Sequence, residues 1–383
     1  MFKIKSRPED FFVKELVNLP LEKEGEYAYY RLRKVDRNTV DVVRELAKRW
    51  KVPVKDVTFA GLKDKNAVTE QYLAVRGLKN PPEKLEGENY ELTLVGFGNE
   101  PLELGKFEGN YFEIVVREVS RAERERAERN LPFVSRYGFA NYFGEQRFGS
   151  VKNAKEFLVR HLLKHRYEDA LREYLLSYSD WRMKRTLKKL WGNWRAFLRA
   201  MPKAATYERK VVEELAKGVP FRQAFMALPK NVRLMFSFTF QSYLWNRYLY
   251  RFVVRYFPYC EVPSGVKDWT YAFYKKMNDR IFEQIKDLEI PYLGVEYKPK
   301  DPKVAKIIEE VLREEGITPD LLGEERIGIK LFSDGVRKAV AVPKDLKMER
   351  LGRSTVKLSF VLPPGSYATV LLRKLFLCER DDT

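Results

Sequence analysis

The chain of 383 residues has only two cysteines and two histidines. The cysteines, Cys260 and Cys378, are too few for a disulfide-rich scaffold or a four-cysteine zinc site. No stretch approaches the roughly 20 consecutive apolar residues of a membrane span, and residues 1–10 contain charges before any apolar signal segment begins. We therefore expect a protein of the reducing cytoplasm with no membrane partner.

Motifs for nucleotide cofactors are also missing. No Gly-x-x-x-x-Gly-Lys-Ser/Thr loop occurs, and Gly96-Phe97-Gly98 is followed by Asn-Glu-Pro, which does not open a dinucleotide-binding helix. His161 and His165 have the four-residue spacing of metal ligands and would share a helix face, but no cysteine accompanies them and no glutamate follows His161. We expect neither a nucleotide cofactor nor a metal ion, and we interpret the histidines as part of a solvated polar face.

Positive charge, in contrast, is in excess. The chain contains 72 lysines and arginines against 54 aspartates and glutamates, a formal net charge of +18. A surface this basic attracts polyanions, of which nucleic acid is the commonest. The 33% of charged residues would also suit a protein of high-temperature origin, but that origin explains many charges rather than an excess of one sign. We therefore expect a nucleic-acid partner.

Hydrophobic periodicity predicts a mixed α/β region in the first 150 residues. Val40, Val43, Ala47 and Trp50 recur at helical spacing, which predicts a helix over residues 40–50. Short apolar or alternating runs bounded by turn residues predict strands as well. These predicted strands cover residues 57–60, 71–76 and 111–119.

The long central part of the chain has a different character. Residues 151–230 are helical in pattern, and residues 236–256 form a second, aromatic-rich helical run. Several prolines predict a looped region over residues 258–302. A further helix is predicted over residues 304–315, stopped by Gly316.

The C-terminal residues again show the mixed strand and helix patterns of the N-terminal region. Alternating apolar residues predict a strand at 356–362, and an apolar run predicts a helix at 368–377. We therefore predict a discontinuous domain, residues 1–150 plus 341–383. An inserted domain, residues 151–340, interrupts it.

A basic, aromatic segment lies within the predicted insertion. It contains no acidic residue and combines seven basic side chains with three tryptophans: Arg182, Lys184, Arg185, Lys188, Lys189, Arg195, Arg199, Trp181, Trp191 and Trp194. Such a segment can bind phosphates and stack on bases. An amphipathic helix with core tryptophans and solvated lysines would have the same pattern, so the sequence leaves both interpretations open.

Two further segments place polar residues in unusual settings. In residues 59–71, a predicted strand ends, Gly61 turns the chain, and Asp64 follows between two lysines, which favour its ionised form. Such a carboxylate suits a nucleophile or a fixed negative charge, although an exposed turn aspartate would look the same. In residues 141–149, two glycines bracket an amide, a guanidinium and aromatic rings. This pattern fits a binding loop for a base or an ordinary turn.

Together these two segments resemble the TruD family of tRNA pseudouridine synthases. Three further stretches are similar to motifs of that family, and all five occur in family order: Lys5-x-x-Pro8-Glu9-Asp10-Phe11-x-Val13, Gly109-Asn110-x-Phe112 with Arg117-Glu118-Val119, and Leu362-Pro363-x-Gly365-Ser366-Tyr367-Ala368-Thr369. The resemblance covers the first 150 residues and roughly the last 30. Residues 151–340 resemble the insertion domain of the family more loosely, chiefly at Gln241-Ser242-Tyr243-Leu244-x-Asn246.

The resemblance implies an α+β fold. A pseudouridine-synthase catalytic domain, with a mixed and mainly antiparallel sheet, would be interrupted by a largely helical α/β insertion domain. The implied reaction detaches a uridine of tRNA at C1′, turns the base and rejoins it through C5. In the family, the usual target is uridine 13 of the D-arm, and neither a cofactor nor a metal is used. We expect tRNA as the partner and a monomeric protein.

The resemblance also implies roles for individual residues. Asp64 occupies the position of the essential aspartate of the family. Five residues match positions that line or flank the uridine pocket: Lys5, Phe11, Asn141, Phe143 and Tyr367. In the basic segment, we expect RNA contacts from Arg182, Lys184, Arg185, Lys188, Lys189 and Trp191. The alternative is a non-catalytic RNA-binding protein, which the same charge and aromatic content would suit.

Overall fold

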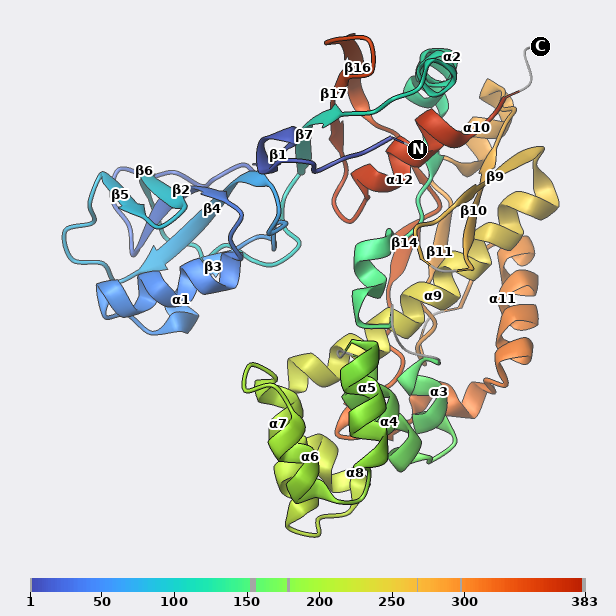
Figure 1. The fold of residues 1–383 in the computed structure, drawn as a ribbon. Coiled ribbons are helices and arrows are strands. Elements are labelled where there is room, and N and C mark those ends of the chain that lie inside the picture. Colours follow the sequence, from blue (N-terminus) through green and yellow to red (C-terminus); the bar gives the residue numbers. More distant parts are fainter. Residues whose placement is uncertain (1, 152–155, 178–179, 267, 297, 381–383) are drawn as a thin grey trace. The chain divides into compact units, whose positions relative to one another are not determined.

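The computed structural model describes residues 2–151, 156–177, 180–266, 268–296 and 298–380 (Figure 1). The chain forms two compact units: unit 1 comprises Met1–Phe139 and Ala341–Thr383, and unit 2 comprises Ala140–Val340. The sequence-based division placed residues 140–150 in the first domain, whereas by contacts they belong to unit 2. They belong there because they bond to later residues of that unit, as when Asn141 N donates to Ala339 O at 2.9 Å.

Unit 1 is built on a nine-stranded sheet. Its strands are β1 (Phe11–Leu16), β2 (Tyr27–Val35), β3 (Val57–Phe59), β4 (Val68–Arg76), β5 (Lys84–Gly87), β6 (Tyr90–Gly98), β7 (Gly109–Val116), β16 (Lys344–Arg350) and β17 (Val356–Leu362). They follow the order β16-β17-β7-β1-β4-β2-β6-β5, with β3 paired to β4. Among these described strands, β1 and β4 are the parallel pair and the other pairs are antiparallel. The predicted mixed, mainly antiparallel α+β fold is therefore confirmed.

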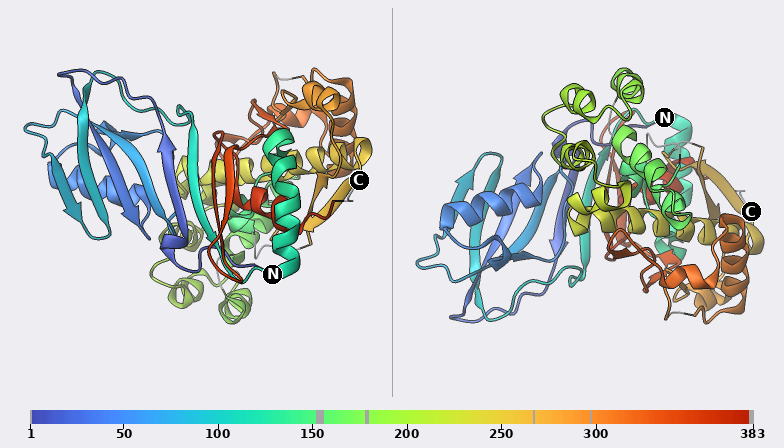
Figure 2. Two further views of the ribbon diagram at one scale, coloured as in Figure 1. Left: turned by 90° about the horizontal axis from the view of Figure 1, so that it is seen from above. Right: turned by 90° about the horizontal axis from the view of Figure 1, so that it is seen from below.

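Helix α1 (Thr39–Trp50) covers one face of this sheet (Figure 2). Its buried side chains pack with apolar residues of β2, β4 and β6 in one hydrophobic cluster. The predicted helix is confirmed, but its predicted buried face is shifted. Val40 is 37% exposed, whereas Val42 and Leu46 are buried together with Val43 and Ala47. Valines at three nearby positions offered two overlapping apolar stripes, and the sheet selects the one centred on Val42 and Leu46.

Two further helices of unit 1, α2 (Arg121–Tyr137) and α12 (Ala368–Leu377), pack against each other (Figure 1). The amide of Asn130 on α2 donates to carbonyls at the C-terminal end of α12, at 2.9 Å to Leu375 O and 2.8 Å to Cys378 O. These bonds satisfy carbonyl groups that a helix end leaves without partners. The predicted C-terminal helix is confirmed, and so is the predicted strand before it, β17.

Unit 2 is mainly helical in its first half. Its helices are α3 (Leu158–Leu163), α4 (Tyr167–Ser177), α5 (Trp181–Lys189), α6 (Trp194–Ala200), α7 (Thr206–Ala216), α8 (Phe221–Ala224), α9 (Lys230–Tyr256), α10 (Asp279–Ile285) and α11 (Pro302–Glu315). The predicted helical character is confirmed for the described part. Helix α9 contains the predicted aromatic-rich run and begins six residues earlier. Gly316 ends α11 with a φ of +66°, the left-handed conformation that glycine adopts readily.

The prediction of a looped region after α9 is wrong. The chain there forms an antiparallel hairpin of β9 (Tyr259–Pro263) and β10 (Thr270–Tyr274), then α10, and then β11 (Glu289–Pro291), which pairs with β14 (Val336–Lys338). Three of the prolines that suggested loops lie at strand ends, since Pro258 precedes β9 and Pro263 and Pro291 are last residues of strands. Proline is tolerated at such positions because few ladder bonds are lost there.

Short strands complete the described structure. They are β8 (Phe139–Ala140), β12 (Glu325–Arg326), β13 (Ile329–Lys330) and β15 (Val340–Ala341). In the part of the chain that the structure covers, no helix combines the length and the apolar character that crossing a bilayer requires.

Candidate active site

Asp64 lies in the loop between β3 and β4 of unit 1. Its side chain is 28% exposed, and the ammonium of Lys5 donates to Asp64 Oδ2 at 2.7 Å. The Lys5 side chain is itself mostly buried, and Lys5 adopts a φ of +57°, an uncommon conformation for a non-glycine residue. The structure therefore brings together two of the residues predicted from the sequence.

Phe11 lies beside the same ion pair. The Lys5 ammonium lies 4.1 Å from the centroid of the Phe11 ring, which is 2% exposed. Phe11 meets Phe112 of β7 edge-to-face, at 6.1 Å between ring centroids. The Phe11 ring therefore makes a cation–π contact with the Lys5 ammonium, and Phe112 of β7 packs against the Phe11 ring. Lys5, Phe11 and Asp64 form one cluster in unit 1, which we call the Asp64 cluster.

Side chains from neighbouring elements fix the backbone of the Asp64 loop. Gln71 Nε2 donates to Gly61 O at 3.0 Å, and the Lys63 backbone N–H donates to Thr39 Oγ1 at 3.4 Å. Lys34 Nζ donates to Asp64 O at 2.7 Å. Because the donors and acceptors come from β4, α1 and β2, the loop is bonded at three points to the rigid part of unit 1. Such anchoring is the requirement for a preorganised catalytic group.

A buried ion pair lies beside these anchors. Lys63 Nζ pairs with Glu15 of β1, and both side chains are almost completely buried. A Cβ atom added at Gly61 would lie 3.0 Å from the Lys63 ammonium. Gly61 therefore leaves the space that the Lys63 side chain uses to reach Glu15. This gives a packing reason for the glycine in the Asp64 segment.

Tyr367 belongs to unit 1 as well. It is half-buried and directly precedes α12, where its carbonyl accepts from Val370 N at 3.1 Å and Leu371 N at 3.2 Å. It follows β17, which lies two strands from β1 in the sheet order. Tyr367 therefore follows a strand that lies on one side of β1 in the sheet order, whereas β4 lies on the other side.

Asn141 belongs to unit 2 and its amide is largely used within that unit. Its Nδ2 donates to Lys338 O at 3.0 Å, and its Oδ1 accepts from Arg337 Nη2 at 2.8 Å. Arg337 Nε also donates to Asn141 O at 2.9 Å. The side chain is 5% exposed. Among the residues that the structure describes, these bonds leave one amide hydrogen and one lone pair of Asn141 for a further partner.

Phe143 lies next to a small pocket in unit 2. The amide of Asn246 on α9 bonds to both backbone groups of Phe143, with 2.8 Å to N and 3.0 Å to O. The guanidinium of Arg337 lies 4.2 Å from the centroid of the Phe143 ring. A pocket of about 240 Å³ is lined by Phe143, Arg147, Phe238, Gln241, Ser242, Tyr292, Ser333 and Asp334. Aromatic rings with an amide and a guanidinium are the groups that contact unstacked bases.

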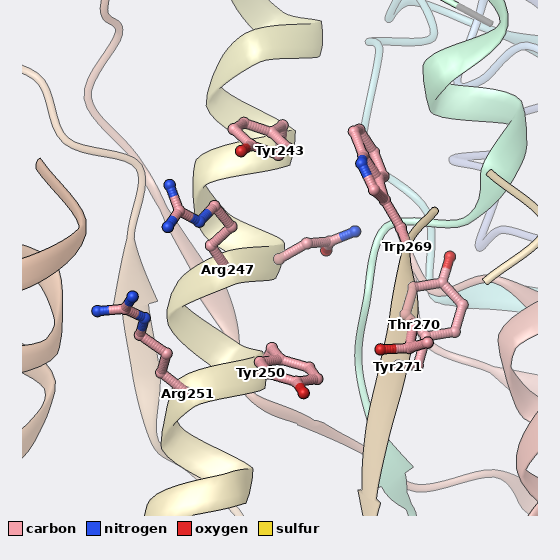
Figure 3. A pocket seen from close by; sticks show the side chains of 8 residues that line it. Tyr243, Arg247, Tyr250, Arg251, Trp269, Thr270 and Tyr271 are labelled. Carbon is pink, nitrogen blue, oxygen red and sulfur yellow. The ribbon is translucent and has the colours of Figure 1, made fainter. Parts of the chain in front are cut away.

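A second pocket of unit 2 lies between α9 and the residues around β10 (Figure 3). It has a volume of about 290 Å³ and is lined by Tyr243, Asn246, Arg247, Tyr250, Arg251, Trp269, Thr270 and Tyr271. Its two arginines are already paired with glutamates of α11, since Arg247 and Arg251 each contact Glu314 at 2.6 Å. Figure 3 shows both guanidinium groups on the side of α9 away from Trp269. This pocket therefore offers aromatic walls with little unpaired positive charge.

The basic segment forms two helices, α5 and α6, instead of one. Asp180 caps α5 by accepting from Met183 N at 2.8 Å. Four predicted RNA contacts are exposed and have no ion-pair partner in the described part of the chain: Arg182, Arg185, Lys188 and Lys189. Lys184 and Lys188 line a pocket of about 410 Å³ together with Trp191. Exposed cations on one short helix suit phosphate contacts.

The tryptophans of this segment differ in their surroundings. Trp191 donates its indole N–H to Glu168 at 2.8 Å, and the Arg172 guanidinium lies 4.9 Å from its ring. It also meets Trp194 edge-to-face at 5.0 Å. Trp191 is therefore packed, which corresponds to the core interpretation of the segment. Trp181, in contrast, is 68% exposed.

The two histidines do not share a helix face, so that expectation is wrong. Helix α3 ends at Leu163, and His165 has a φ of +54°, which turns it off the helix. His161 Nδ1 is 3.0 Å from Arg166, and His165 Nε2 is 3.0 Å from Arg326. Within the described ranges, no three His, Cys, Asp or Glu side chains gather as potential metal ligands.

Two residues were not predicted from the sequence. Lys34 contacts the Asp64 loop but lies on β2, a strand that the sequence analysis did not identify. The sequence does contain a signal for its burial. Lys34 follows Tyr30 and Leu32 at every second position of β2, so it shares a strand face with two apolar residues. Trp181 was noted only as part of the basic segment, because the pattern did not separate an exposed indole from packed ones.

Comparison with known proteins adds a family assignment to this geometry. The family model described as tRNA pseudouridine synthase D (TruD) matches residues 2–375. The chain is 55% identical to tRNA pseudouridine synthase D of Aquifex aeolicus, over 98% of both chains. It is 32% identical to the "Probable tRNA pseudouridine synthase D 2" of Methanocaldococcus jannaschii, over 98% of this chain and 92% of the relative.

The fold agrees with a solved structure as well. A TruD structure from Methanosarcina mazei matches with a TM-score of 0.70 at 24% identity, covering 98% of this chain and 93% of that one. A match at that identity supports the fold, while the family assignment depends on the sequence comparisons. The chain therefore belongs to the TruD family of tRNA pseudouridine synthases.

Proposed function

We propose that the protein converts uridine 13 in the D-arm of tRNA into pseudouridine, with Asp64 as the catalytic carboxylate. The observation that carries this proposal is the Asp64 cluster. A carboxylate bonded to Lys5 at 2.7 Å stands on a loop that three other side chains anchor. Such a group is fixed, charged and still accessible, as nucleophilic or electrostatic catalysis requires.

The reaction needs charge control at the ribose. The C1′–N1 bond breaks, a C1′–C5 bond forms, the hydrogen on C5 leaves to solvent, and N1 gains a proton. Asp64 would attack C1′, add to the base or remove a proton from C2′. Each route uses the carboxylate that Lys5 Nζ contacts at 2.7 Å. No redox step or external group transfer occurs, so we expect no cofactor and no metal.

The substrate base has to leave its stack before the chemistry. Flipping a base costs a few kcal/mol, and stacking on aromatic rings, worth about 1–3 kcal/mol per base, offsets much of that cost. In unit 1 we assign this role to the half-buried Tyr367, while the buried Phe11 supports Lys5. In unit 2 we assign Phe143 to the wall of the pocket that it lines. Asn141 would use its remaining amide hydrogen and lone pair on the uracil edge.

The rest of the tRNA would be held by phosphate contacts. The net charge of +18 suits such binding. We assign contacts to the exposed cations of α5, Arg182, Arg185, Lys188 and Lys189, with Lys184 at the edge of the adjoining pocket. Trp191 would support this surface from within, because its ring is packed. We further expect the protein to act as a monomer in the cytoplasm, where tRNA is processed.

The proposal is tested by mapping. Unmodified tRNA is incubated with the protein, treated with carbodiimide, which marks pseudouridine, and read by primer extension. We expect one new stop, at uridine 13, and none with Asp64→Ala. A stop at another uridine would contradict the position but keep the activity. Tight tRNA binding without any stop would favour the alternative, a non-catalytic RNA-binding protein, for which the exposed Trp181 and its basic helix would suffice.

A further inference from the structure

Lys34 is a completely buried lysine beneath the Asp64 loop. It lies on β2, directly across from Thr69 of β4, and its side chain is 0% exposed. Its ammonium donates to the backbone carbonyl of Asp64 at 2.7 Å. The side chain therefore reaches from the sheet to the main chain of the proposed catalytic residue.

The protein compensates this buried charge poorly. Among the described residues, no carboxylate lies within ion-pair distance of Lys34 Nζ, and the Asp64 carbonyl is its one acceptor. The neighbouring hydroxyl of Thr69 is also buried without a hydrogen-bond partner in the described part of the chain. A buried ammonium with one hydrogen bond is destabilising, and an apolar side chain of similar length would be more stable. Groups of this kind are typical of functional sites.

Three lysines surround the Asp64 loop and each has a different acceptor. Lys5 bonds to the Asp64 carboxylate, and Lys63 pairs with Glu15. Only Lys34, among these three, bonds to the backbone of Asp64. A bond to that carbonyl fixes the peptide from which the carboxylate extends. Misplacement of a reacting group by about 1 Å can lower a rate by about 100-fold, so this peptide is a sensitive point.

We propose that Lys34 is a positioning residue of the synthase: its buried ammonium fixes the Asp64 peptide and thereby aims the carboxylate. The inference rests on the proposed function, since it requires that Asp64 act on the substrate. Lys34 itself touches no substrate. Its effect should therefore fall on kcat and leave the KM for tRNA nearly unchanged.

The charge of Lys34 is sensitive to mild alkali. Burial lowers the pKa of Lys34 to about 8, while the Asp64 carboxylate raises it and Lys63 lowers it further. Below that pH the ammonium is charged, and it loses its proton as the pH rises towards 9. A neutral amine still donates a hydrogen bond, but charge-assisted bonds are about twice as strong. The contribution of Lys34 to kcat should therefore decline over this interval.

The experiment compares Lys34→Met with the wild type and with a control, Lys55→Met. Lys55 is an exposed lysine of unit 1 that precedes β3 and lies outside the Asp64 loop. With tRNA as substrate, we expect Lys34→Met to lower kcat at pH 7 by about 10-fold or more with KM within about twofold. The ratio of wild-type to variant kcat should shrink between pH 7 and pH 9, whereas the ratio for Lys55→Met stays near one. Ratios cancel any titration of the tRNA itself.

Thermal unfolding separates positioning from simple stability. Because methionine removes a buried charge, we expect a Tm of Lys34→Met equal to or above that of the wild type. An unchanged kcat would overturn the inference, and so would a loss of kcat accompanied by a lower Tm and a higher KM. Asp64→Asn decides the proposed function separately. If Asp64→Asn is inactive while Lys34→Met is fully active, only the Lys34 inference fails; if Asp64→Asn is active, the catalytic assignment itself fails.

Discussion

The Asp64 loop of unit 1 and the Asn141 segment of unit 2 use their hydrogen bonds in opposite ways. In the Asp64 loop, other side chains bind the backbone, and the carboxylate remains 28% exposed with Lys5 beside it. In the Asn141 segment, the predicted functional amide itself bonds to Arg337 and Lys338 and is 5% exposed. In the first arrangement other side chains stabilise the loop backbone, whereas in the second the predicted functional amide itself completes a buried hydrogen-bond network.

This difference separates two kinds of predicted site residue. A side chain that the fold does not need can be removed at little cost in stability and a large cost in activity. A side chain that completes a buried network lowers stability when it is removed, because its former partners lose their bonds. Substitutions in the two segments should therefore separate activity from stability.

The largest effect is expected for Asp64→Asn. The substitution keeps the shape but removes the negative charge, so no nucleophilic or electrostatic role survives. We expect pseudouridine formation to fall by about 1,000-fold or more, with tRNA affinity within a few fold and no loss of Tm. Quantitative carbodiimide primer extension and filter binding give the two numbers. If Asp64→Asn formed pseudouridine at a rate within tenfold of the wild type, the Asp64 loop would no longer differ from the Asn141 segment in its importance for activity.

A smaller loss is expected for Lys5→Met. It removes the ammonium that bonds to Asp64 Oδ2 and lies over the Phe11 ring, and it keeps an unbranched side chain of similar length. We expect kcat to fall by about 10- to 100-fold, the range of one well-placed charge in a partly buried site. Lys3→Met is the control, since Lys3 pairs with Glu118 where both side chains are about 60% exposed. Equal effects of the two substitutions would show that the Lys5 bond has no special role.

Asn141→Ala should act first on stability. It removes the acceptor of Arg337 Nη2 and leaves a buried guanidinium under-bonded. We expect the free energy of unfolding to fall by about 1–3 kcal/mol, measured by urea denaturation. Asn231→Ala, at an exposed position of α9, should change it by less than about 0.5 kcal/mol. A stable Asn141→Ala protein with strongly reduced activity would instead give the amide a purely substrate-binding role.

The smallest effect is expected on α5. Arg185→Ala with Lys188→Ala removes two exposed cations and should weaken tRNA binding by a few fold at moderate salt. The slope of log affinity against log salt should decrease by about 1.5–2, the share of two phosphate contacts. Binding titrations between low and moderate salt measure both quantities. An unchanged slope would show that the cations of α5 make no phosphate contacts and are simply solvated.

Local patterns were sufficient for much of the fold. The helix over residues 40–50, the strand at 356–362 and the helix stopped by Gly316 each have a clear period or a strong stop signal, and each is found. The hairpin of β9 and β10 was missed because prolines at strand ends have the same sequence signature as loops. The four-residue spacing of His161 and His165 predicted a shared helix face, but the helix ends at Leu163, and the spacing alone does not indicate where a helix ends.

The candidate site was predicted through motifs rather than through periodicity. Motif resemblance supplied Asp64, Lys5 and Phe11, which the structure gathers in one cluster. It could not supply the bonds of Asn141, because they depend on Arg337 and Lys338, almost 200 positions later. Lys34 was missed because burial of a lysine depends on tertiary pairing of β2 with β4, which no local pattern contains.

We propose isomerisation of uridine in tRNA by one carboxylate, which Lys5 and an anchored loop hold in place. Its most direct test is a single-turnover measurement of tritium release from tRNA labelled at C5 of uridine, with wild type and Asp64→Asn each in excess over the tRNA. We predict release of the label from one uridine per tRNA by the wild type and none above background by the variant, although both bind the tRNA. Release by Asp64→Asn at the wild-type rate would contradict the account.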